Sequence, residues 1–381
     1  WSALSAVFNH IDIDDVRAAR IAVLRRPLPS TSQGKGPDID IAHLAARIDL
    51  AAAVAGRAVT LSAEGRLRYI SLHDLSADLA IARLDNTDRY RIDGGIVHDV
   101  ARGRVAIREG ADGILGTLLG LPGLGPVNVA AEARGDAAKN VVSLTASMGA
   151  LEATGQGIIQ LSGGRADLDF RARAPAMAPN AQIAWQSLSA EGHLHGSFHQ
   201  PRIDAHLDLA GAHFGGIAAS RLVLDAQGAG GVADVKGTAE GVTIPGDEPD
   251  LFAHAPVRLS AHADLAAKAR PVTFALDHPF ASLKGQASTA GPLAVSADLV
   301  ISSLAPFTAR RNMDLSGSGH LHLTAAVVGS GLELGAQGTL DAKGTDVAAR
   351  LLGHAELSVT AVVQGSDLLQ SRLVFKGQAV S

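Results

Sequence analysis

Apolar and polar residues alternate along most of the chain. From residue 59 to residue 69, every odd position is apolar or glycine and every even position is polar. Residues 167–173 and 257–265 repeat this pattern. A period of two residues is typical of a β-strand with one dry face and one wet face. The pattern therefore predicts strands in these segments and also in residues 203–209, 321–325 and 355–361.

Turn signals separate the predicted strands at intervals of roughly 10–15 residues. Glycine pairs and clusters predict tight turns at residues 94–95, 163–164 and 228–231. Proline-bearing segments predict longer loops at residues 27–37, 175–180 and 244–250. Because short connections join neighbouring strands that run in opposite directions, we expect antiparallel meanders.

Residues 39–58 are rich in alanine, and propensity alone would permit a helix there. The two-residue period nevertheless holds on both sides of Ala42 and His43, with a one-residue shift between the two parts. A β-bulge produces such a shift, so we interpret the whole segment as strand. Only residues 112–119 and 3–8 have the pattern of short helices.

The chain has no run of amphipathic helices that would cover the dry faces of the predicted strands. A two-sheet sandwich would divide the chain into domains of about 100 residues, each with its own core, but the pattern barely changes between residues 59 and 374. We therefore expect an all-β fold. It consists of an elongated, curled (taco-like) antiparallel sheet with an apolar groove and few short helices, and it is continuous over residues 1–381.

Composition argues against several classes of protein. A net charge of -5 disfavours a nucleic-acid partner, which needs a concentrated basic surface. The absence of cysteine excludes disulfide scaffolds, cysteine-based zinc sites and iron–sulfur clusters. Aromatic residues make up only 3% of the chain, whereas the pockets of enzymes are usually lined by aromatic side chains. We therefore expect neither enzymatic activity nor a cofactor.

No stretch reaches the roughly 20 apolar residues that a membrane-spanning helix needs. The nearest one, residues 114–129, is interrupted by glycines and prolines. Trp1 begins inside patterned sequence, without the basic start of a signal peptide. We expect the sequence to be a piece of a longer chain.

Pairs of polar residues that share one strand face are the candidates for metal or acid–base chemistry. These pairs are His193 with His195, His320 with His322, Asp12 with Asp14, and Asp167 with Asp169. The histidine spacing is compatible with a metal site, but the neighbours on that face are ordinary polar residues. The aspartates lie opposite the apolar face, whereas acid–base catalysis needs a carboxyl group in an apolar pocket. We expect no metal site and no catalytic residue.

Glycine-rich segments are interpreted as turns. Residues 120–125 lack the Lys-Ser/Thr pair of a phosphate-binding loop, so they predict a helix stop and a turn. Residues 316–319 and 329–331 are interpreted as turns as well.

Several segments resemble the TamB family, the inner-membrane component of the translocation and assembly module, which is related to AsmA-like proteins. The resembling segments are residues 1–4, 11–13, 21–29, 114–126, 188–209, 304–307 and 351–353. Residues 114–126 resemble a short helix that enters a new strand in the family. Residues 188–209, with four residues between Gly196 and Pro201, resemble the β-repeats of the superfamily. The order of these segments and their alternating apolar and polar pattern extend the resemblance over most of the chain.

The resemblance implies a role in the periplasm of Gram-negative bacteria. Members of the family resemble bridge-like lipid-transfer proteins with an apolar-lined β groove. The resemblance implies that phospholipids move between the inner and outer membranes, and that outer-membrane protein assembly is assisted. The family's N-terminal inner-membrane anchor and its C-terminal region, which meets an outer-membrane TamA-like barrel, are missing from this sequence. We therefore expect the chain to be the middle periplasmic span.

Phospholipid acyl chains are the expected partners of the groove. Its expected lining comprises Leu61, Leu67, Leu168, Phe170, Ile203, Leu207, Leu209, Val257, Leu259, Leu265, Leu321, Leu323, Leu357 and Val359. A β-helical surface protein, such as an autotransporter passenger or adhesin, is the alternative, because it would also be repetitive, glycine-rich and free of cysteine. Its stacked rungs should show a fixed repeat and ladders of Asn or Thr. The scarcity of Asn and the drifting spacing of this chain favour the groove.

Overall fold

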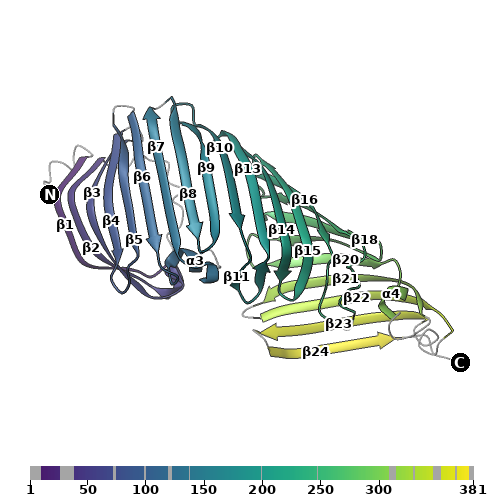
Figure 1. Cartoon of the computed structure of the whole chain (residues 1–381). Coiled ribbons are helices and arrows are strands. Elements are labelled where there is room, and N and C mark those ends of the chain that lie inside the picture. The colour runs from purple at the N-terminus through teal and green to yellow at the C-terminus, as the bar shows by residue number, and fades with distance from the viewer. Residues whose placement is uncertain are drawn as a thin grey trace. The chain divides into compact units, whose positions relative to one another are not determined.

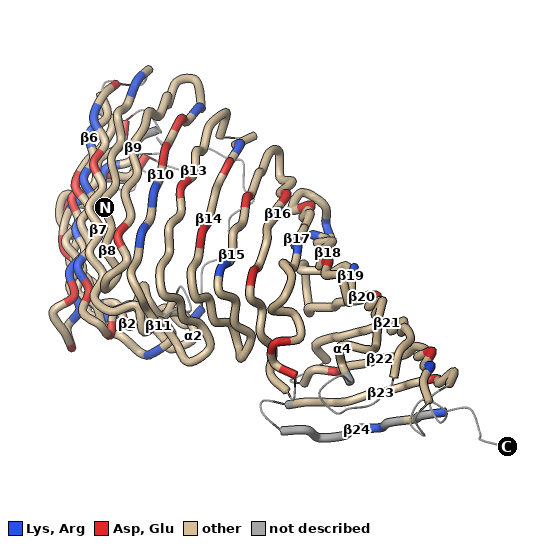
Figure 2. The backbone as a smooth tube through the Cα atoms, turned by 45° about the vertical axis from the view of Figure 1, so that its right-hand side comes forward, with Lys and Arg blue, Asp and Glu red and all other residues tan. Residues whose placement is uncertain are grey.

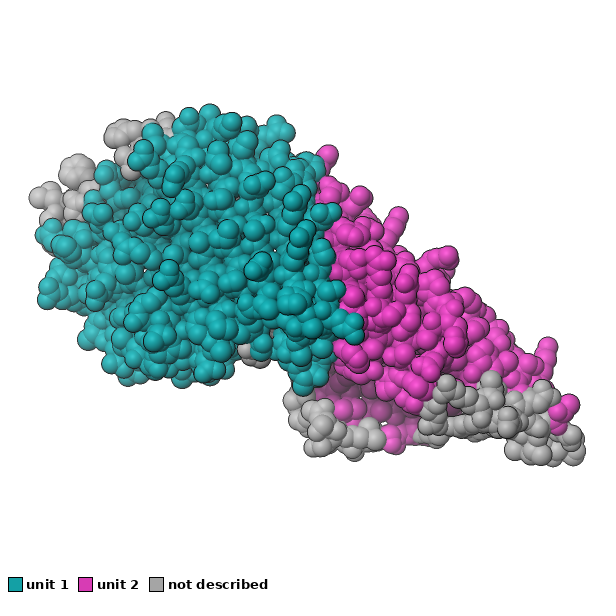
Figure 3. Space-filling view, viewed as in Figure 1, with its two compact units in different colours: residues 1–201 teal, residues 202–381 magenta. Residues whose placement is uncertain are grey.

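The structure is a computed structural model that describes residues 10–25, 38–71, 74–97, 100–118, 122–136, 138–198, 200–246, 248–308, 315–328, 331–345, 353–364 and 367–376. Strands account for 74% of it and helices for 4%, and the large antiparallel sheet is not closed into a barrel. The predicted all-β fold is confirmed. The chain divides into two compact units, Trp1–Pro201 and Arg202–Ser381 (Figure 3).

The first unit contains a ladder of long strands (Figure 1). The strands are β1 (His10–Val23), β2 (Asp38–Leu50), β3 (Val59–Ser71), β4 (Asp74–Arg83), β5 (Arg89–Val97), β6 (Val100–Glu109), β7 (Val127–Asp136), β8 (Asn140–Met148), β9 (Leu151–Gln160), β10 (Arg165–Ala174), β11 (Met177–Asn180), β12 (Ile183–Trp185) and β13 (Ser187–Ser197). From β2 to β10 each strand pairs antiparallel with the next, and β10 then pairs with β13. The small hairpin of β11 and β12 interrupts the chain between these two partners. β1 differs from the meander because it pairs with β2 in parallel.

The second unit continues as a simple antiparallel meander. Its strands are β14 (Gln200–Phe214), which begins at the boundary, β15 (Ile217–Ala229), β16 (Val232–Glu240), β17 (Val257–Asp264), β18 (Pro271–His278), β19 (Ala281–Ser288), β20 (Ala294–Ile301), β21 (Ser316–Val328), β22 (Gly331–Lys343), β23 (His354–Gln364) and β24 (Asp367–Lys376). Each strand pairs antiparallel with the next one in the chain. The short helices of the two units are α2 (Ala52–Ala55), α3 (Ile114–Leu118), α4 (Ala305–Thr308) and the 3-10 helix η1 (Pro122–Leu124).

The alanine-rich segment after residue 38 is part strand and part helix. The register of β2 against β3 shifts between Ile41 and Leu44, which confirms the predicted bulge. β2 ends at Leu50, however, and α2 follows, so the strand interpretation of residues 51–58 is wrong. Gly56 ends α2 with a φ of 78°, and its N–H donates to the carbonyl of Ala52. Beyond Leu50 the high helix propensity of alanine decides the local structure.

Some predicted turns are strands. Gly94 and Gly95 lie inside β5, and residues 316–319 begin β21. A Cβ atom on Gly95 would lie 2.3 Å from the carbonyl oxygen of Leu75, so this glycine permits close approach of a neighbouring strand. The predicted loop at residues 175–180 contains β11 for most of its length.

Other local predictions agree with the structure or cannot be compared with it. The helix predicted at residues 112–119 is confirmed by α3, and the turn at residues 163–164 is confirmed as well. Of the turn predicted at residues 228–231, residues 230–231 form a turn, whereas residues 228–229 still belong to β15. Residues 3–8 lie outside the described residues, and so does the whole of the predicted loop at residues 27–37.

Connections of very different length join the strands at the two sides of each ladder. In the first unit the longest connections between antiparallel partners, residues 51–58, 110–126 and 175–186, all lie at the same strand ends, which we name the insert side. Figure 1 shows α3 and β11 at these ends. In the second unit, the insert side consists likewise of the strand ends that are joined by residues 241–256 and 302–315. The opposite ends, the turn side, carry shorter connections.

Fully buried apolar residues gather at the insert sides. In the first unit Ala55, Val59 and Ile114 form one cluster, against which Leu61 and Tyr90 pack. In the second unit Leu315 and Ala342 form another cluster, with Leu304 against it. α2 and α3 therefore cover one end of the strands, while the remaining length of the strands is free for a different role.

Candidate functional site

Antiparallel register brings apolar residues of successive strands into continuous rows. One row of opposed residues in the first unit comprises Ile41, Leu67, Ala77, Gly94, Gly103, Ala133, Val142, Gly157, Leu168 and Leu194. The next row toward the insert side comprises Leu44, Gly65, Leu79, Ile92, Val105, Ala131, Leu144, Gly155, Phe170 and Gly192. Because neighbouring strands place opposed residues on the same face, these rows define an apolar face that crosses the unit from β2 to β13.

The second unit has the same arrangement with larger side chains. Its central row comprises Leu207, Leu224, Gly237, Leu259, Leu276, Leu283, Leu299, Leu321, Gly338 and Leu357. Every position in this row is leucine or glycine. The row defines the apolar face of the second unit from β14 to β23.

Large apolar side chains on these faces remain in contact with solvent. Ile92 and Leu144 are each 39% exposed in the first unit, and Ile203 is 37% exposed in the second. A closed core would bury such side chains almost completely. A cavity of about 390 Å³ lies on the face of the first unit, with Val142, Leu168 and Phe170 in its lining. The apolar face is therefore open to a ligand along this part of the sheet.

The structure places nearly all of the predicted lining residues on the two apolar faces. Leu265 differs because it follows the end of β17 on the turn side, where it is 52% exposed. Leu61 packs under α2 and α3, and Leu209 is only 6% exposed, so neither is free to line an open groove. The remaining positions are Leu67, Leu168, Phe170, Ile203, Leu207, Val257, Leu259, Leu321, Leu323, Leu357 and Val359.

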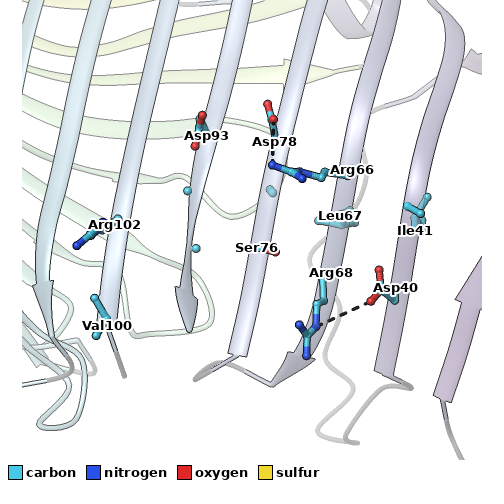
Figure 4. Close-up of a pocket in the computed structure, with 14 residues that line it drawn as sticks. Asp40, Ile41, Arg66, Leu67, Arg68, Ser76, Asp78, Asp93, Val100 and Arg102 are labelled. Atoms are coloured by element: carbon cyan, nitrogen blue, oxygen red, sulfur yellow. Dashed lines mark ion pairs between the residues drawn. The ribbon is translucent and has the colours of Figure 1, made fainter. Parts of the chain in front are cut away.

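Acidic and basic residues are interspersed along the strands of the first unit (Figure 2). Because successive residues of a strand point to opposite faces, those that alternate with the apolar rows lie on the opposite face. A hollow of about 480 Å³ lies on β2 to β6, and Figure 4 shows the side chains around it. Arg66 pairs with Asp78 at 3.6 Å, and Arg68 pairs with Asp40 at 3.9 Å. Since bases face acids across neighbouring strands, the hollow has no concentrated charge of one sign. Exposed pairs of this kind stabilise a fold by at most about 1 kcal/mol each.

Histidines on the polar faces pair with aspartates directly opposite them. The Nδ1–Oδ1 distances are 2.9 Å for His193–Asp169, 2.7 Å for His206–Asp225, 2.8 Å for His262–Asp234, 2.9 Å for His322–Asp298 and 2.7 Å for His354–Asp341. These contacts account for His193 and His322, two of the metal candidates. Among the described residues, no group of three or more His, Asp or Glu is placed to hold a metal ion. Asp167 and Asp169 are 70% and 63% exposed, whereas acid–base catalysis needs a carboxyl group that apolar surroundings shield from water.

The His354–Asp341 pair gives a testable dependence on pH. The hydrogen bond and the charge of Asp341 raise the pKa of His354 above its ordinary value. The stabilising interaction between His354 and Asp341 is therefore fully present below the pKa of about 6.5 that histidine has in the unfolded chain. It is lost as the pH rises through the pKa of His354 in the folded protein. An NMR titration of the His354 ring should show this raised pKa, and Asp341→Asn should lower it. An unchanged midpoint in the variant would contradict the pairing.

A buried polar cluster at the insert side of the first unit was not predicted from the sequence. Arg83 is 5% exposed and Asp88 is fully buried, and their side chains meet at 3.1 Å. Asp88 also accepts the N–H of Gly110 at 2.8 Å, while Glu109 accepts the N–H of Leu115 at 3.0 Å. These bonds fasten the connection that contains α3 to β4 and β6.

Tyr90 completes this cluster. Its hydroxyl donates to Glu109, and burial together with that carboxylate raises the pKa of Tyr90. The phenol therefore stays protonated and keeps its donor role. Every member of the cluster is engaged in holding the backbone or a neighbouring side chain, so the arrangement is suited to structure.

Comparison of the chain with models of protein families, with curated proteins and with solved structures found no match. None of the described helices has the length and apolar character needed to cross a membrane.

Proposed function

We propose that the apolar faces of this chain hold phospholipid acyl chains. In this proposal the chain is the periplasmic span of a longer, TamB-like protein. That span conducts phospholipids between the inner and outer membranes or assists outer-membrane protein assembly. The observation that carries the proposal is the continuity of the apolar rows from β2 to β13 and from β14 to β23. In the rows of the first unit, Ile92 and Leu144 are each 39% exposed, where a closed core would hide them.

The energy of lipid transfer explains why such a face would be useful. Each methylene group that leaves water gains about 0.8 kcal/mol. Two acyl chains of roughly 16 carbons therefore oppose transfer through water with on the order of 20 kcal/mol. An apolar face that accompanies the chains removes most of this barrier, and no bond needs to be made or broken.

Strand pairing supports this proposal over the β-helical alternative. A β-helix stacks parallel rungs of fixed length, whereas the described strands from β2 onward pair antiparallel with neighbours along the chain. The proposed partners beyond the lipid are an inner-membrane anchor and an outer-membrane TamA-like barrel. Both would be reached through parts of a longer protein.

Lipid analysis of the purified chain tests the proposal. The chain is produced in the periplasm of a Gram-negative host, washed free of membranes, extracted with organic solvent and examined by mass spectrometry. We expect phospholipid in stable molar proportion to the protein. A chain of equal purity that carries no phospholipid, and that acquires none from mixed phospholipid micelles, would contradict the proposal.

A further inference from the structure

A cavity of about 440 Å³ lies on the apolar face of the second unit. The connection at residues 241–256, which we name the roof, contributes Val242, Ile244 and Phe252 to its lining. The floor of this cavity includes Leu259, Leu276, Leu283 and Leu299, which are four consecutive members of the central leucine row. A roofed cavity of this size falls within the range of small-molecule sites.

The roof is held in an ordered conformation. Thr243 and Ala218 exchange backbone hydrogen bonds of 3.0 and 2.8 Å, which continue the pairing of β15 with β16 beyond Glu240. Val242 forms a β-bridge with Phe252, so the connection closes on itself as a small loop. Phe252 also packs edge-to-face on the imidazole of His278, with 5.0 Å between ring centroids. The roof is thus attached to the sheet on both sides of the cavity.

The chemistry of the cavity selects a tail without a charged group. Among the described residues, no Lys, Arg, Asp or Glu lines the cavity, and Ser282 and His278 are the polar side chains in its lining. Burial lowers the pKa of His278, so its imidazole is neutral at neutral pH. A charged headgroup inside would lose its hydration without finding a partner. The headgroup must therefore remain outside, near the mouth at Phe214 and Ile217, which are 41% and 47% exposed.

We propose that this roofed cavity is a discrete binding site for the end of one linear fatty-acyl chain. This proposal rests on the proposed function, because it places one defined binding site on the apolar face. A lipid elsewhere on the apolar face meets only the strands, whereas a tail in this cavity also meets Val242, Ile244 and Phe252 of the roof. These added contacts increase the apolar area removed from water, so the cavity should bind a tail at a single saturable position.

A fluorescent fatty acid tests this site in the complete chain freed of lipid. Titration with cis-parinaric acid should saturate at one molecule per chain, and palmitate should displace the probe. Leu283→Trp places a bulky ring on the floor of the cavity and should weaken binding by about tenfold or more, as misfitting groups do in apolar pockets. Lys284→Trp is the matched control, since Lys284 is the next residue of β19, lies exposed on the opposite face and is not in the cavity lining. Binding by the control should stay within about twofold of the unmodified chain, a difference below 0.5 kcal/mol.

Two further measurements separate the possible failures. Phe252→Ala removes a roof side chain outside the strands and should also weaken the probe, while circular dichroism reports whether each variant folds. Equal binding by the unmodified chain, Leu283→Trp and Phe252→Ala would overturn the roofed site, even if phospholipid still co-purifies. A chain that binds neither phospholipid nor the probe would overturn both this site and the proposed function.

Discussion

Replacing Leu144 with glutamate should remove most of the bound phospholipid from the first unit. Leu144 lies on the apolar face of β8, opposed by Ala131 and Gly155, and is 39% exposed. The introduced carboxylate can stay hydrated in the empty chain, so folding should survive. A bound acyl chain would desolvate that carboxylate at a cost of about 2 kcal/mol or more, which corresponds to a roughly 30-fold loss of retained lipid.

The adjacent residue supplies a matched control for this prediction. Thr145 lies on the opposite face of the same strand, exposed and between Ala130 and Thr154. Thr145→Glu adds the same charge at almost the same place but does not touch the apolar face. The amount of phospholipid bound per chain is measured by mass spectrometry in both variants. Titrations with the fluorescent fatty acid are compared only between variants whose melting temperature is unchanged. Equal lipid content in the two variants would contradict a role for the apolar face.

Removing Arg83 should produce the largest loss of stability among the charged residues discussed here. Arg83→Met leaves the fully buried carboxylate of Asp88 without its cation, and Arg83 also donates to the carbonyl of Asp112 at 2.9 Å. Breaking a buried ion pair in this way costs about 3–5 kcal/mol. The free energy of unfolding, measured with urea, should fall by that amount. Amide hydrogen exchange should accelerate first in residues 110–118, which the cluster fastens to the sheet.

An exposed ion pair in the same unit provides the comparison. Arg91 meets Asp78 at 2.8 Å but is 55% exposed. Arg91→Met should therefore change the free energy of unfolding by about 1 kcal/mol or less. If the two methionine variants unfold at the same urea concentration, the buried cluster does not fasten the connection with α3.

Much of the fold could be predicted because its information is local. Alternation at residues 59–69 predicted β3, and a one-residue change of phase at Ala42 and His43 predicted the bulge. Glycines were harder to interpret, because glycine serves both turns and close strand approaches. Phe170, for example, is opposed by Gly155 and Gly192, so the glycines leave room for a large neighbour on the same face. That requirement depends on strand register, which alternation within one strand does not contain.

Register also limited what the sequence could say about the candidate site. Alternation assigned Leu168 and Leu207 to a dry face, but only pairing across strands showed that the dry positions join into rows. The pairing of His193 with Asp169 and the burial of Arg83 depend in the same way on residues brought together from different strands. The roof over the second unit was predicted only as a proline-bearing loop at residues 244–250. Nothing in its composition indicated that its apolar residues would line one cavity together with leucines of the central row.

Photo-crosslinking along the second unit tests most directly whether lipid tails travel against the apolar face. A photoreactive amino acid is placed at Leu207 or Leu259 on the central row, and at Asp208 or Arg258 on the opposite face of the same strands. The variants are expressed in Gram-negative cells, irradiated, purified and examined for covalently attached phospholipid. We expect labelling at both leucine positions and none above background at the two charged positions. Labelling at Asp208 and Arg258 equal to that at the leucines, or no labelling at any of the four, would contradict a lipid path along the leucine row.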